Sequence, residues 1–178
     1  MKKELITYVH RDIDGHNDDT SEEVIYLRDI SEGKTEKIQI DQLSKYDDCL
    51  FVTFQPDDLI SKMSESTVCR NHIIDIECMD KQIRQSTNFR MYNDKWSIPN
   101  MLATYLEEEE RDWNTDDIET LMVTLAHCYT IMKAVSEKEW NRICEIEIPV
   151  NRILYLAQKK GIYFNIDCVE DECRKHHK

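Results

Sequence analysis

Apolar residues in the first half of the chain form short runs of the kind that build β-strands. Four runs are separated by polar segments and contain β-branched or aromatic residues: Leu5–Val9, Val24–Leu27, Lys37–Ile40 and Leu50–Phe54. The polar turn Ser31–Lys34 contains a glycine, so we expect the second and third runs to pair as a hairpin. A fifth run, His72–Ile76, predicts a short buried strand or a strand-to-helix turn. Pro56 then stands where a helix can begin.

The connection between the first two runs is short and polar, and it contains Gly15 and Asn17. Such a connection suits a hairpin better than a crossover helix. We therefore expect the strand at Leu5–Val9 to be central or next to central, and antiparallel to the strand at Val24–Leu27.

The second half of the chain has apolar residues three and four positions apart, which is the period of an amphipathic helix. Ser97 is the expected cap of a first helix, with apolar positions Ile98, Met101, Leu102, Tyr105 and Leu106. Thr115 or Asp116 is the expected cap of a long helix with apolar positions Ile118, Leu121, Met122, Leu125, Tyr129, Met132 and Val135.

A last helical segment follows the long helix. Trp140–Ile146 predicts continued helix, and Pro149 opens a helix that Gly161 ends. The apolar positions expected to face inward are Val150, Ile153, Leu154 and Ala157. We expect Ile153 and Leu154 to be buried against the long helix. Strands first and helices later, with interleaving between them, predict an α/β domain with a mixed sheet flanked by helices.

Composition limits the classes of function. The 178 residues are 40% hydrophobic and 33% charged, which is typical of a folded domain with a charged surface. A net charge of −13 argues against a module that grips nucleic acid through a broad basic face. No apolar run approaches the roughly 18 residues that span a membrane. Seven cysteines without a CxxC pair indicate reduced thiols and a cytoplasmic protein.

Residues 145–167 read EIEIPVNRILYLAQKKGIYFNID. This segment resembles the end of the 3′–5′ exonuclease domain of family A DNA polymerases, the DNA polymerase I family. The positions that follow the pattern without a gap are Glu147, Ile148, Pro149, Ile153, Leu154, Gly161, Ile162, Phe164 and Asn165. Ser97–Leu106 and Ile73–Asp75 resemble upstream elements of the same family. The resemblance implies a ribonuclease H-like domain over residues 1–167, with 168–178 as a tail or the start of a following module.

In that family two Mg²⁺ or Mn²⁺ ions, held by about four carboxylates, activate water and stabilise the leaving oxygen. The resemblance places the first carboxylates at Asp12 and Asp14, directly after the first strand. The second motif falls on Asp58, and the third on Asp116 or Asp117. The candidate catalytic set is therefore Asp12, Asp14, Asp58, Asp116 and Asp117, and the candidate metal ligands are Asp12, Asp14, Asp58 and Asp117.

Each of the three motifs lacks a supporting residue. The first is Asp-x-Asp, so its second arm is one methylene short of the family's Asp-x-Glu. Phe54 stands where the family has Asn, and Asp57 where it has an aromatic residue. Asp112 or Trp113 stands where the third motif has Tyr. We therefore expect a degenerate site and a structural role beside a polymerase module. If the site is active, its substrate is a DNA 3′ end.

Three other constellations of residues offer alternative interpretations. His10–Gly15 matches the His-x-Asp-x-Asp-Gly opening of DHH phosphoesterases, but the later signatures of that family are missing. Asp75–Cys78 resembles the first exonuclease motif of family B polymerases. The tail offers four thiol or imidazole groups that suit zinc, at a spacing that matches no common finger: Cys168, Cys173, His176 and His177. A different class of function is a non-catalytic interaction domain whose acidic surface contacts a basic protein.

Overall fold

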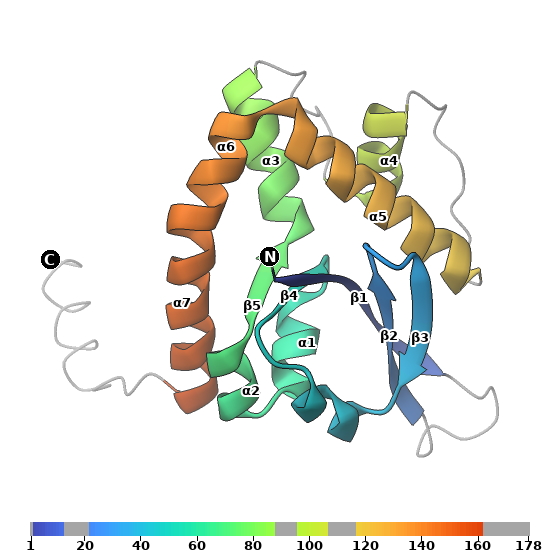
Figure 1. The fold of residues 1–178 in the computed structure, drawn as a ribbon, viewed down its shortest axis with the longest axis vertical. Coiled ribbons are helices and arrows are strands. Elements are labelled where there is room, and N and C mark those ends of the chain that lie inside the picture. The colour runs from blue at the N-terminus through green and yellow to red at the C-terminus, as the bar shows by residue number, and fades with distance from the viewer. Residues whose placement is uncertain (1, 13–21, 88–95, 107–116, 162–178) are drawn as a thin grey trace, which may run out of the picture.

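The computed structural model describes residues 2–12, 22–87, 96–106 and 117–161 (Figure 1). Five strands form one sheet: β1 (Lys3–Asp12), β2 (Glu22–Asp29), β3 (Lys34–Ile38), β4 (Cys49–Thr53) and β5 (His72–Asp75). The helices before α4 are the 3₁₀-helix η1 (Ile40–Lys45), α1 (Pro56–Lys62), α2 (Glu65–Arg70) and α3 (Ile76–Thr87). The later helices are α4 (Ile98–Leu106), α5 (Ile118–Val135), α6 (Glu137–Arg142), the π-helix η2 (Ile143–Glu147) and α7 (Ile148–Lys160).

The strand order across the sheet is β3-β2-β1-β4-β5. β1 is antiparallel to β2 and β2 to β3, whereas β4 is parallel to β1 and β5 is parallel to β4. The sheet is therefore mixed, and the predictions of a central first strand and of two successive antiparallel pairs are confirmed. A parallel β1–β2 pair would have favoured the DHH-like alternative, whereas the observed pair is antiparallel.

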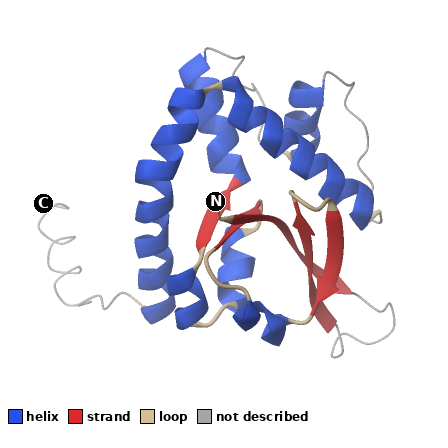
Figure 2. Ribbon diagram, viewed as in Figure 1, coloured by secondary structure: helices blue, strands red, loops and turns tan. Residues whose placement is uncertain are grey.

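Helices cover both faces of the sheet, as Figure 2 shows. Side chains alternate between the faces along each strand, so neighbouring residues enter different cores. Ile6 and Val52 pack in a core with α3, α4 and α5, whereas Leu5 and Phe51 pack on the other face with α1 and α2. The molecule thus has an α/β architecture with a mixed sheet between two helical layers, as the sequence predicted.

The long helix α5 is confirmed, but its cap differs from the predicted one. Asp117 is the N-cap, and its side chain accepts a hydrogen bond from the backbone N–H of Thr120. Thr115 and Asp116 lie outside the described residues. Six of the seven predicted apolar positions are buried or partly buried, while Val135 at the last turn is exposed.

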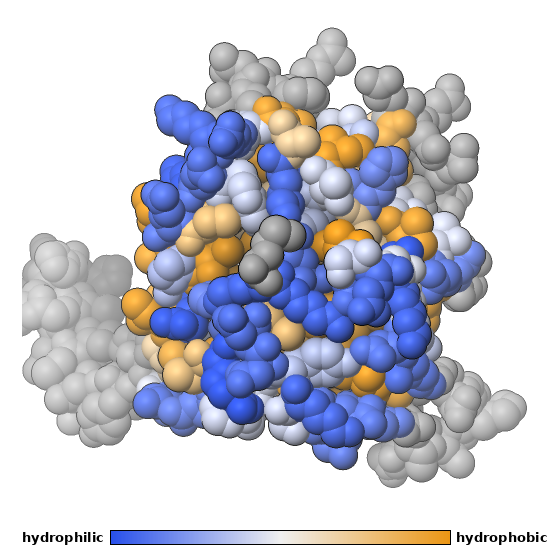
Figure 3. All heavy atoms as spheres, viewed as in Figure 1, coloured by the Kyte–Doolittle hydropathy of each residue, from blue (hydrophilic) through white to orange (hydrophobic). Residues whose placement is uncertain are grey.

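The orientation of α7 corrects the sequence prediction. α7 lies along the edge strand β5 and beside α2 (Figure 1), and its inward residues are Ile148, Tyr155 and Leu156. Ile153 and Leu154, which were expected to be buried against α5, are exposed instead. Figure 3 shows apolar atoms along the outer border of the molecule beside α7. The helix has apolar residues on two sides, and the period alone does not tell which side meets the sheet.

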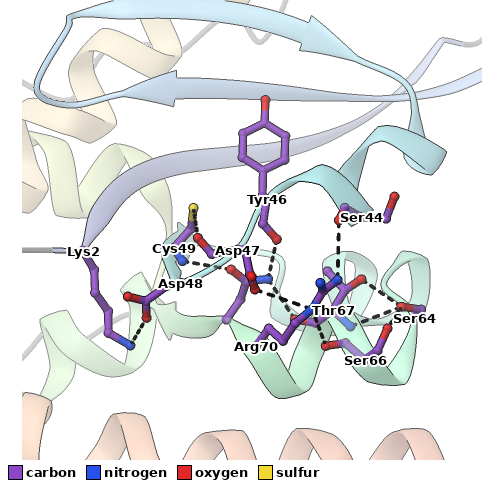
Figure 4. Close-up of polar contacts among 11 residues, drawn as sticks. Lys2, Ser44, Tyr46, Asp47, Asp48, Cys49, Ser64, Ser66, Thr67 and Arg70 are labelled. Carbon is purple, nitrogen blue, oxygen red and sulfur yellow. Dashed lines mark hydrogen bonds and ion pairs between the residues drawn. The ribbon is translucent and has the colours of Figure 1, made fainter.

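The start of β4 is fixed by one buried amide, and its partners Tyr46, Cys49 and Thr67 are labelled in Figure 4. Asn71, at the end of α2, accepts a hydrogen bond from the Cys49 backbone N–H at 2.9 Å. Its side-chain N–H groups donate to the backbone carbonyls of Tyr46 at 3.0 Å and Thr67 at 2.9 Å. This side chain therefore ties α2 to the loop that enters β4, and satisfies three backbone groups that burial would otherwise leave unmatched.

A buried carboxylate holds α4 in place. Asp80 of α3 is buried and accepts hydrogen bonds from Arg84 Nε at 2.7 Å and from the Tyr105 hydroxyl at 2.7 Å. Its second oxygen accepts from the indole N–H of Trp96 at 3.0 Å. The Arg84 guanidinium also lies 5.5 Å from the centre of the Tyr105 ring. The network therefore links α3 to α4 and to the residues just before it.

Candidate functional site

The carboxyl end of β1 extends beyond the strand beside it. β1 pairs with β4 from Lys3 to Ile6, but with β2 as far as Asp12. Where β4 has ended, the Gln55 side chain accepts a hydrogen bond from the Val9 backbone N–H at 3.1 Å. A cavity of about 570 Å³ opens at this position, lined by Tyr8, Val9, His10, Glu23, Gln55, Asp58 and Lys62. The carboxyl ends of parallel strands are common ligand sites in α/β sheets.

Aromatic rings line one side of this strand end. Tyr8 stacks on Phe54 with 5.6 Å between the ring centres, and His10 lies 5.7 Å from Tyr8 and 6.0 Å from Tyr26. Burial, and then the neighbouring Tyr26, raises the pKa of the Tyr8 hydroxyl above its usual value. Of these rings, Tyr8 and His10 line the cavity.

Charged groups line the other side of the cavity. Lys62 of α1 forms a partly buried ion pair with Glu23 of β2. Asp58 is exposed in the first turn of α1, where the positive end of the helix dipole stabilises a carboxylate. The cavity therefore brings Asp58 and the Lys62–Glu23 pair together with the imidazole of His10.

The described acids of the first two motifs, Asp12 and Asp58, lie at or near this end of the sheet. Asp12 is the last residue of β1 and pairs with Glu22 of β2. Asp58 lines the cavity. Asp14 lies outside the described residues.

The third predicted position lies elsewhere. Asp117 is exposed at the start of α5, where its oxygens accept from the Thr120 N–H at 3.1 Å and the Thr120 hydroxyl at 2.6 Å. These hydrogen bonds, led by that of the hydroxyl, lower the pKa of Asp117. Two residues later Glu119 pairs with Arg28, which stands opposite Ile6 in the sheet. Ile6 is about 20 Å along β1 from Asp12, at roughly 3.3 Å per residue.

Asp58 and Asp117 also belong to different layers. α1 buries its apolar residues on one face of the sheet, and α5 buries those of its own on the other. The described carboxylates of the second and third motifs are therefore not brought together. Among the described residues, no group of three or more His, Cys, Asp or Glu side chains is placed to hold a metal ion.

The acids of the family B resemblance occupy a separate position at the end of β5. The Asp75 carboxylate accepts from the Glu77 N–H at 2.9 Å and from the Cys78 thiol at 3.1 Å. Burial, and then this hydrogen bond, raises the pKa of the Cys78 thiol to about 12. Glu77 pairs with Lys81 one turn later. The polar groups of this cluster are thus hydrogen-bonded or ion-paired locally, at the end of β5 and in the first turns of α3. The cavity beside them is only about 70 Å³.

Most of the cavity wall was not predicted from the sequence. Tyr8, Glu23, Gln55 and Lys62 come from three separate segments, and the sequence motifs assigned none of them to the site. The available signal was the antiparallel pairing of the first two strands, which places Glu23 beside the end of β1. The candidate zinc ligands of the tail lie outside the described residues.

The helices of the described segments include none that is long and apolar enough to cross a membrane. Comparison with protein-family models gives no match, and comparisons with curated proteins and with solved structures give none either.

Proposed function

We propose that the chain is a ribonuclease H-like domain of the exonuclease type found in family A DNA polymerases, and that it acts as a non-catalytic support for a polymerase module. The mixed sheet, with an antiparallel β1–β3 meander followed by the parallel strands β4 and β5, is consistent with a ribonuclease H-like arrangement. The resemblance of residues 145–167 falls on η2, α7 and the segment after them.

The separation of the candidate carboxylates is the observation that carries the non-catalytic role. A two-metal site needs several carboxylates within a few ångströms of one another, because both ions share the reacting phosphate. Asp58 lines the cavity at the end of β1, whereas Asp117 caps α5 on the other face of the sheet. A four-carboxylate site that included Asp117 would require this side chain to leave the hydrogen bonds that it makes with Thr120.

Two further expectations belong to this proposal. Cys49, Cys69, Cys78, Cys128 and Cys144 are free thiols, which suits the reducing cytoplasm. The net charge of −13 suits a basic protein surface as a partner, because opposite charges steer association. Without metals the domain requires no cofactor. Direct contact with DNA would then depend on the polymerase module.

The test is digestion of a 5′-labelled single-stranded DNA in the presence of Mg²⁺ or Mn²⁺. Wild type, Asp12→Ala, Asp58→Ala and the control Asp57→Ala are compared, since Asp57 lies in the same helical turn as Asp58 but does not line the cavity. We expect all four proteins to leave the DNA intact. Robust digestion that Asp12→Ala and Asp58→Ala abolish, while Asp57→Ala retains it, would overturn the non-catalytic role.

A working 3′–5′ exonuclease is the second candidate, and the cavity itself is the observation that favours it. Asp58 lines a space of about 570 Å³ beside the strand that ends at Asp12. In this alternative Asp12, Asp14, Asp58 and either Asp116 or Asp117 bind Mg²⁺ or Mn²⁺ and the terminal nucleotide of a DNA 3′ end. Activity lost on chelation with EDTA and restored by Mn²⁺ would support it.

A further inference from the structure

The outer face of η2 and α7 has a stripe of large apolar side chains in contact with solvent. Ile146 is 53% exposed, Val150 44%, Ile153 66% and Leu154 57%. We call these four residues the outer stripe. Val150, Ile153 and Leu154 are three and four positions apart, so they share one face of α7. The only other large apolar side chains of comparable exposure in the described segments are Val123 and Val135.

The outer stripe is not the side of α7 that packs against the protein's own core. The opposite side of α7 already packs on the sheet and on α2 through Ile148, Tyr155 and Leu156. The stripe therefore faces away from the domain, along the border where Figure 3 shows apolar atoms. A contiguous apolar patch on one helix face is a feature of interaction surfaces.

The charges near the outer stripe differ between its two ends. Glu145 and Glu147 lie at its amino-terminal end, and Lys160 lies at its carboxyl-terminal end. Lys159 is on the inner side of α7, where its ammonium donates to the backbone carbonyl of Ser61 in α1 at 3.0 Å. Glu147 pairs with Arg142, and Lys160 forms an ion pair with Glu65 in which both side chains are more than half exposed. Two such helices placed side by side attract at both ends when they are antiparallel, and repel at both ends when they are parallel.

We propose that the outer stripe is a dimerisation surface, on which α7 of a second copy of this chain packs antiparallel. A two-fold axis across the middle of α7 places each acidic end against a basic end, and each copy contributes the same residues. The 13 residues of α7 span about 20 Å, so the contact is small. Small interfaces associate weakly, and we expect a dissociation constant on the order of 10–100 μM.

Sedimentation equilibrium of the full chain tests the proposal at about 0.15 M salt, where the Debye length of about 8 Å limits general repulsion between acidic copies. Between about 5 and 500 μM, the weight-average mass of wild type rises from the monomer value of 21.3 kDa toward twice that value. Leu154→Asp stays monomeric, because dimerisation would bury its carboxylate. The control Val123→Asp, on α5, associates like wild type, and circular dichroism confirms that each variant is folded.

A charge exchange tests the antiparallel orientation. Glu145→Lys places lysines of both copies at each end of the contact, and weakens dimerisation about three- to tenfold. Adding Lys160→Glu restores opposite charges and recovers most of the affinity. A wild type that stays monomeric over the whole range, or a Leu154→Asp variant that dimerises like wild type, overturns the proposal. If the double variant dimerises no more tightly than Glu145→Lys alone, the antiparallel arrangement is overturned.

Discussion

Replacing the buried carboxylate of Asp80 by an amide should be one of the most costly conservative changes in this domain. Asp80→Asn keeps the volume of the side chain but removes the negative charge beside Arg84, whose side chain is itself 96% buried. It also turns an acceptor into an N–H donor opposite Arg84, Tyr105 or Trp96, all three of which donate to Asp80. Breaking a buried ion pair costs about 3–5 kcal/mol. We expect Asp80→Asn to lower the free energy of unfolding by about 3 kcal/mol, at the low end of this range, because the asparagine oxygen can still accept hydrogen bonds from part of the network.

Urea denaturation followed by circular dichroism at neutral pH measures this loss. Asp41→Asn is the matched control, because Asp41 is exposed in the first turn of η1, and such surface changes stay within about 0.5 kcal/mol. The slope of the unfolding free energy against urea concentration should stay the same, since the surface exposed on unfolding hardly changes. A loss below about 1 kcal/mol for Asp80→Asn would refute the assignment of this network as the anchor of α4.

Four further substitutions test the packing and the electrostatics. Leu154→Ala should cost less than about 0.5 kcal/mol in the monomer because the side chain is exposed, while Leu125→Ala in the buried face of α5 should cost about 2–5 kcal/mol; urea denaturation at low protein concentration measures both. Asn71→Ala should cost about 2–3 kcal/mol, because three backbone groups lose their buried partner, and thermal melting should show it; a change below 0.5 kcal/mol would contradict the role given to this amide. Burial opposes ionisation of Asp29, but hydrogen bonds from Ser31 and Lys3 outweigh it and lower the pKa of this carboxyl from 3.8 to about 2. Its stabilisation is thus present above pH 4 and lost as the pH falls through 2, so Asp29→Asn should remove about 1–2 kcal/mol at pH 7 and flatten the stability curve between pH 4 and 2.

The strands could be predicted because their apolar runs are short, β-branched and separated by turn residues. Central placement of the first strand followed from the length and polarity of the segment that leads to Val24. The direction of α7 could not be predicted in the same way. Val150 and Ile153 form an apolar stripe at helical spacing, but so do Ile148, Tyr155 and Leu156. Only the contact of α7 with β5 in the folded structure shows that the second stripe faces inward.

The candidate site was predictable only in part. The resemblance placed Asp58 after β4, where it lines the cavity, and placed Asp12 at the end of β1. It did not join them to Gln55, whose side chain continues the hydrogen bonding of β1 beyond the end of β4. That contact depends on the register between two strands more than forty residues apart, which local periodicity does not contain.

The central claim is that the carboxylates of this domain do not assemble a two-metal site, and thermal melting of the full chain with and without millimolar Mn²⁺ tests it most directly. An ion that binds only the folded state at about 100 times its dissociation constant adds about 2.7 kcal/mol of stability. For a domain of this size that corresponds to a rise in melting temperature of about 5–10 °C. We predict a change below about 1 °C at constant ionic strength, equal in wild type and Asp12→Ala. A rise of several degrees in wild type that Asp12→Ala and Asp58→Ala abolish would contradict the claim.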